Sequence, residues 1–97
     1  MDFTKNFNKK IRNELLKEIE KFETPIKGNK KYIAVFKDGK KIAFGDKNYF
    51  HFRDTTPNQD YKFLNHYDPD RRRLYYARKN KNYGKYSPDT LSKIFLW

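Results

Sequence analysis

Apolar positions in the first 25 residues follow the period of a helix. They are spaced by four, four, four and three residues, which forms one stripe on a helical surface. The opposite face mixes Lys and Glu, as solvated helix faces do, whereas a membrane-surface helix is mainly basic there. Pro25 stands where a helix should already have ended. We therefore predict an amphipathic helix over residues 1–25 that packs through Phe7, Ile11, Leu15, Ile19 and Phe22.

Residues 31–53 predict a β-meander of three strands. Asp38-Gly39 separates two short apolar runs in KYIAVFKDGKKIAFG (residues 31–45), a hairpin signal because Gly accepts the positive φ of a two-residue turn. Gly45-Asp46 marks the next break. Residues 48–53 then alternate, with Phe50 and Phe52 on one face, which predicts the third strand.

Two cap signals predict two short C-terminal helices. In Asp68-Pro69-Asp70 and in Ser87-Pro88-Asp89, a polar cap precedes a proline suited to the first helical position. We expect a basic helix over residues 68–80 and a closing helix over residues 87–97. The predicted fold class is α+β, with residues 1–97 forming a single domain.

The charge of the chain indicates more about its partner than its hydropathy does. The 97 residues carry a formal charge of +11, and aromatic residues make up 19% of them. Basic residues exceed acidic ones in every part of the chain, by seven to five in residues 1–27, seven to three in 28–57 and nine to four in 58–97. A protein this basic attracts polyanions. We therefore expect its partner to be a nucleic acid, bound without sequence specificity, or else an acidic protein surface.

Membranes and secretion are not expected. No apolar run reaches signal-peptide length or the ~20 residues needed to span a bilayer. The absence of cysteine excludes disulfides and thiolate metal sites, and leaves the redox compartment open.

The predicted basic helix carries the main candidate site. About 3.6 residues per turn aligns Arg71, Tyr75 and Arg78, with Arg72, Tyr76 and Lys79 in the adjacent row. Guanidinium groups suit phosphates, and tyrosines add hydrogen bonds or stacking. Equally, the tyrosines could belong to the core and the arginines could pair with carboxylates. Lys40 and Lys41 could extend the basic patch along the hairpin, or they could protect a sheet edge against pairing with another chain. The predicted nucleic-acid-binding residues are Arg71, Arg72, Arg73, Tyr75, Arg78, Lys79, Lys40 and Lys41.

No catalytic or metal signature is present. His51 and His66 lie in no metal-ligand spacing, and His51, alternating with Phe50 and Phe52, reads as structural. The sequence has no phosphate-binding Gly loop and no nucleophile elbow. We expect a non-enzymatic protein with no cofactor and no metal, and a metal-dependent nuclease is the weakest alternative.

Three stretches, DGKKIAFGDKNYFHFRD, HYDPDRRRLYYARKN and SPDTLSKIFLW, resemble an uncharacterised family of small basic proteins of giant DNA viruses of algae and protists. The resemblance covers roughly residues 31–97 and departs from the family pattern at Asn80, where a histidine is expected, and after Trp97, where a basic tail is expected. It implies a virion-associated protein, or one of the host cytoplasm or nucleus, with no established activity. The elements that carry it are Phe44-Gly45, Asp68-Pro69, Arg72-Arg73, Tyr75 or Tyr76, Arg78 and Leu96-Trp97.

A second hypothesis is a protein-interaction module, such as a minor capsid element. Tyr and Trp are enriched among residues that dominate interface energy, and basic rims steer association with acidic subunits. Its predicted anchors are Leu96 and Trp97.

Overall fold

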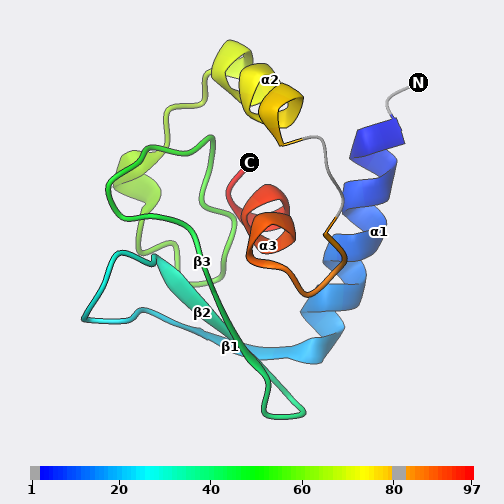
Figure 1. Cartoon of the computed structure of the whole chain (residues 1–97), viewed down its shortest axis with the longest axis vertical. Coiled ribbons are helices and arrows are strands. Elements are labelled where there is room, and N and C mark those ends of the chain that lie inside the picture. The colour runs from blue at the N-terminus through cyan, green and yellow to red at the C-terminus, as the bar shows by residue number, and fades with distance from the viewer. Residues whose placement is uncertain (1–2, 80–82) are drawn as a thin grey trace.

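The computed structural model describes residues 3–79 and 83–97, with side chains from Asn8 onward. Helix α1 (Phe3–Glu18) leads into an antiparallel sheet of β1 (Ile19–Glu23), β2 (Tyr32–Phe36) and β3 (Lys41–Phe44), followed by the short 3-10 helix η1 (Lys62–Leu64) and helices α2 (Pro69–Arg78) and α3 (Pro88–Phe95). Helix α3 lies between the sheet and α2, and α1 runs along its side (Figure 1). The predicted α+β class is confirmed.

The N-terminal helix is shorter than predicted. It ends at Glu18, and the chain continues without a linker into β1. Ile19 and Phe22 are both buried, three residues apart, which in a regular strand would place them on opposite faces. A bulge between Ile19 and Lys21 returns Phe22 to the core side. A bulged strand thus reproduces a helical spacing, which is why residues 1–25 read as one helix. Of the predicted stripe, Phe7 lies outside the described side chains.

The connection between β2 and β3 contains Asp38 and Gly39. The amide of Phe36 donates to the Lys40 carbonyl at 2.8 Å, and the Gly39 amide donates to the Phe36 carbonyl at 2.9 Å. These bonds close a loop of three residues, Lys37 to Gly39, where the sequence suggested a turn of two. Gly39 has a φ of +94°, which a residue without Cβ adopts at little cost.

The predicted third strand over residues 48–53 is wrong, and the predicted meander over residues 31–53 is corrected accordingly. The third strand is β1, which pairs with β2 on the side away from β3. Within residues 48–53 only His51 forms a bridge, an isolated parallel one with Asn65. The chain instead turns at residues 47–48 and bends at residues 49 and 52, and its amides bond to loops and to the end of α3, with Arg53 donating to the Leu96 carbonyl at 3.0 Å.

Both predicted helix starts in the C-terminal half are confirmed. The Asp68 carboxylate accepts from the amides of Asp70 and Arg71, and the Ser87 hydroxyl accepts from the amide of Thr90. Helix α2 ends at Arg78, and residue 80, the predicted end, lies outside the described residues. None of the helices among the described residues is long and apolar enough to cross a membrane.

The core lies where α1 and α3 pack on one face of the sheet. Phe95 of α3 meets the ring of Phe22 edge-on, with ring centroids 5.0 Å apart, and Leu91 is fully buried beside them. The Arg12 guanidinium of α1 donates to the Ile94 carbonyl at 3.1 Å and to the Thr55 hydroxyl at 2.8 Å. One side chain therefore ties α1 to α3 and to the long connection between β3 and α2.

That connection, residues 45–68, is anchored by the buried carboxylate of Asp54. The Tyr32 hydroxyl of β2 donates to it, as do the Thr56 hydroxyl at 2.6 Å and the Tyr61 amide at 3.1 Å. Burial, followed by the Asp54 hydrogen bond, raises the pKa of Tyr32, so this hydroxyl stays a donor. Asp54 thereby fastens a segment with little regular structure to the central strand.

Replacing Tyr32 with Phe should lower the free energy of unfolding by about 1–3 kcal/mol, because the buried carboxylate loses one of its donors and the Asp60 amide loses the hydroxyl that accepts from it. Urea unfolding followed by circular dichroism measures the change. Tyr49→Phe is the matched control, since the Tyr49 side chain is exposed and its loss of a hydroxyl should cost less than about 0.5 kcal/mol. Equal losses in both variants would show that Asp54 does not anchor the connection.

Candidate nucleic-acid interface

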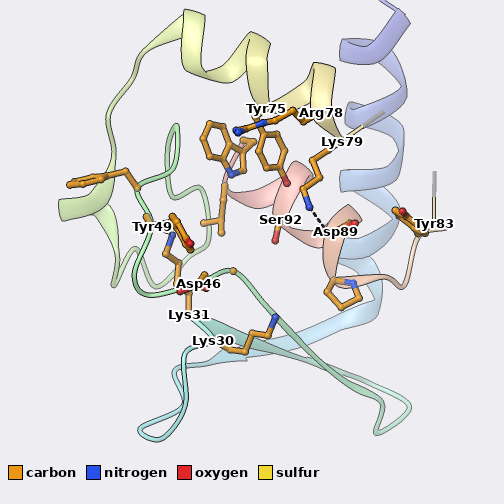
Figure 2. Close-up of a pocket in the computed structure, with 15 residues that line it drawn as sticks. Lys30, Lys31, Asp46, Tyr49, Tyr75, Arg78, Lys79, Tyr83, Asp89 and Ser92 are labelled. Atoms are coloured by element: carbon orange, nitrogen blue, oxygen red, sulfur yellow. Dashed lines mark hydrogen bonds and ion pairs between the residues drawn. The ribbon is translucent and has the colours of Figure 1, made fainter. Parts of the chain in front are cut away.

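A groove of about 850 Å³ opens between α2, the two ends of α3 and the loop of residues 45–50. Figure 2 shows basic and aromatic side chains from these elements facing the same space. Among the described residues, four basic side chains line it against two acidic ones, Asp46 and Asp89. Its basic and aromatic lining residues are Lys30, Lys31, Arg78, Lys79, Tyr49, Phe50, Tyr75, Tyr83 and Trp97.

A smaller hollow of about 370 Å³ adjoins the groove. It shares Tyr49, Phe50, Arg78 and Trp97 with the groove and adds Arg71 and Leu74 of α2, with His66. The two hollows therefore form one surface, named here the aromatic-basic groove. Arg71, Leu74 and Arg78 are three and four residues apart, so they lie on the same face of α2.

Trp97 and Tyr75 form a stacked pair in this lining. Their ring planes lie within 4° of parallel with centroids 4.2 Å apart. Tyr75 is buried, and its burial, with the nearby Asp89 charge, raises the pKa of its hydroxyl. The predicted role of Tyr75 as a free contact for nucleic acid is therefore corrected: one face of its ring is already covered by Trp97.

Arg72 is occupied within the protein. Its Nε donates to the backbone oxygen of Trp97 at 2.6 Å, and its guanidinium lies 4.9 Å from the ring centroid of Phe52. Arg72 thus positions Trp97 in the groove lining. We assign it a structural role, in place of the predicted phosphate contact.

The remaining basic residues of α2 are accessible. Arg71 and Arg73 each lie 3.9 Å from an aspartate on the preceding turn, and Lys79 lies 3.8 Å from Asp89. Exposed pairs of this length contribute little, because solvent screens them. Arg78 forms no ion pair with the described side chains, those of residues 8–79 and 83–97. These four cations can pair with an incoming anion at small cost.

Lys40 and Lys41 do not join this surface. They lie at the β2–β3 hairpin, which is at the opposite end of the molecule from α2 (Figure 1). The Lys40 ammonium lies 3.7 Å from the ring centroid of Tyr86 and 3.7 Å from the Asp38 carboxylate. The predicted extension of the patch along the hairpin is therefore wrong.

The two predicted protein anchors are also engaged internally. The Leu96 side chain is 1% exposed. It packs so closely against Gly45 that a Cβ added to this glycine would lie 3.0 Å from it. Trp97 is half-buried between Tyr75 and His66. Leu96 is part of the core cluster and offers no surface to a partner.

A buried pair, Lys31 and His51, holds the loop that forms one wall. The Lys31 ammonium donates to the Tyr49 carbonyl and to His51 Nδ1, both at 2.8 Å. Burial lowers the pKa of Lys31 to about 8, and burial with the Lys31 charge lowers that of His51 to about 4. His51 is therefore neutral at pH 7, and its Nε2 donates to the Asn65 side-chain oxygen at 2.7 Å. The structural role predicted for His51 agrees with this burial.

Tyr49 and Phe50 are the site residues that sequence reasoning missed. Their side chains are 67% and 56% exposed, whereas the predicted strand put them on opposite faces. The turn-forming run Gly45-Asp46-Lys47-Asn48 was the available signal. The Asp46 carboxylate accepts from the Asn48 amide at 2.8 Å, which turns the chain and directs the next two side chains outward.

The His51 imidazole should stay neutral until about pH 4, as NMR titration of the ring protons would show. A folded pKa below the unfolded value of 6.5 means that the unfolded chain takes up the proton first. The contribution of neutral His51 to the free energy of unfolding should thus be complete above about pH 6.5 and should fall as the pH drops toward 4. The free energy of unfolding should decrease by about 2 kcal/mol between pH 7 and 5. His51→Asn should remove that part of the pH dependence. An imidazole titrating near 6.5 would contradict the burial argument.

Comparison with protein-family models, curated proteins and solved structures gives no match to this chain. The resemblance to a giant-virus family therefore stays a prediction. Among the described residues, no three His, Asp or Glu side chains gather as a metal site would require. Function has to be inferred from the chemistry of the aromatic-basic groove.

Proposed function

We propose that the protein binds nucleic acid without sequence specificity, as a non-enzymatic protein, through the aromatic-basic groove and the exposed face of α2. One observation carries the proposal: accessible cations and exposed aromatic rings line the same surface of a protein with a formal charge of +11. Phosphates pair with the cations, while rings contact sugars or bases. The virion location implied by the resemblance stays a prediction.

Electrostatics supports a polyanion as the ligand. Arg71 and Arg78 lie two helical turns apart on one rim, about 10 Å along the axis, so they can meet different phosphates of one strand. Lys30 faces Arg78 across the groove from the β1–β2 connection (Figure 2). Cations on both sides suit a chain of negative charges better than they suit a single carboxylate.

A protein-interaction module is less well supported by the geometry. Its two anchors are used inside the fold, with Leu96 in the core and Trp97 stacked on Tyr75. An interface anchor contributes when it moves from water into a partner's pocket, and neither side chain has much surface left to transfer.

Reversing charge at the groove should weaken binding. We expect Arg71→Glu/Arg78→Glu to lower affinity for a short DNA at ~50 mM salt by at least about tenfold, and to reduce the slope of log K against log salt by about 1 per residue. Fluorescence anisotropy from about 50 to about 200 mM salt measures both quantities. Arg72 is left unchanged, because it positions Trp97.

The matched control is Lys37→Glu/Lys41→Glu, two exposed lysines at the hairpin with the same total change in charge. If binding depended only on net charge, both double variants would lose the same affinity, and the groove would not be the site. No salt-sensitive binding by the unaltered protein would overturn the proposed function itself.

Trp97, the single tryptophan of the chain, should report on occupancy of the groove. We expect its fluorescence to be quenched on titration with oligonucleotide, to a plateau that matches the anisotropy curve, because nucleobases would lie near the indole. Dextran sulfate, a polyanion without bases, provides the control and should leave the emission little changed. Unchanged emission at saturating oligonucleotide would place the bound nucleic acid elsewhere on the protein.

A further inference from the structure

We propose that the aromatic-basic groove selects single-stranded nucleic acid, whose unpaired bases stack on the exposed rings of Tyr49 and Phe50. This inference rests on the proposed function and names its substrate class. It depends on three features of the described residues: two exposed rings on an anchored loop, a groove of limited volume, and cations on the facing rim.

The Tyr49 and Phe50 side chains make no ring contact with the described side chains, those of residues 8–79 and 83–97, although both are large and mostly exposed. Their backbone, in contrast, is well anchored. The Lys31 ammonium binds the Tyr49 carbonyl, the Tyr49 amide donates to the Asp46 carbonyl at 3.2 Å, and the next amide, that of His51, donates to the Leu64 carbonyl. The rings are therefore presented to solvent by an ordered loop, which lowers the entropy lost on stacking.

The size of the groove favours one strand. A volume of about 850 Å³ lies in the range of sites for small ligands, so it can accommodate one or two nucleotides. In a duplex each base is stacked above and below and offers no free face to a protein ring, whereas a single strand offers its bases readily. A duplex could reach the cations of α2 but not engage the rings.

The facing rim supplies cations to a strand whose bases point at the loop. Arg71 and Arg78 border the hollow that Tyr49 and Phe50 also line, with the exposed Leu74 between them. Phosphates along the α2 rim and bases toward residues 49–50 would thus occupy opposite sides of one surface.

The experiment compares three ligands of matched strand length by fluorescence anisotropy at about 100 mM salt: a 12-nucleotide oligothymidine, a 12-base-pair duplex, and a 12-unit oligomer of abasic deoxyribose phosphate. Stacking on an aromatic ring changes affinity by about tenfold per base. We expect the oligothymidine to bind about 10- to 100-fold more tightly than the abasic oligomer, and more tightly per phosphate than the duplex.

Tyr49→Ala/Phe50→Ala should lower affinity for oligothymidine to that for the abasic oligomer, while leaving the abasic affinity unchanged. Phe63→Ala is the matched control for Phe50→Ala, because Phe63 is 71% exposed and lies outside the groove lining. Circular dichroism checks the fold of each variant.

Equal binding of oligothymidine and abasic oligomer, unaffected by the double variant, would overturn the inference and leave the proposed function in place. A preference for oligothymidine that survives the double variant would also overturn it, since other rings would then stack the bases. No binding of any of the three ligands would overturn the proposed function together with the inference.

Discussion

The buried carboxylate of Asp54 is the interaction on which the rest of the structure depends. A charge removed from water is tolerated only when donors surround it, and here a tyrosine from the sheet, a threonine hydroxyl and backbone amides do so. These donors come from β2 and from the connection between β3 and α2. Satisfying the carboxylate therefore forces a segment with little regular structure into one path over the sheet.

The same network reaches the groove. The Asn65 side-chain oxygen accepts from the Asp54 amide and from His51 Nε2, each at 2.7 Å, and His51 in turn accepts from Lys31. Lys31 completes the series at the Tyr49 carbonyl. Hydrogen bonds thus connect the core to the loop that presents Tyr49 and Phe50.

Helix α2 shows how one basic, aromatic sequence is divided between structure and surface. Tyr75 turns inward onto Trp97, Tyr76 links α1 to α3 through Asn8 and the Lys93 carbonyl, and Arg72 binds Trp97. Arg71 and Arg78 remain on the groove side. Of the two readings that the sequence left open, burial holds for Tyr75, whereas a phosphate-binding role for Arg71 and Arg78 stays a proposal.

Local signals in the sequence determined the fold class and the starts of α2 and α3, because Asp68 and Ser87 satisfy amides only a few residues away. Tertiary structure alone decided the rest. Ile19 and Phe22 belong to a bulged strand because β2 supplies their partners, and residues 48–53 turn and bend without joining the sheet because distant loops and α3 receive their hydrogen bonds. The candidate site was likewise only half predictable: a sequence lists basic and aromatic residues, but which of them face solvent together depends on packing between segments far apart in the chain.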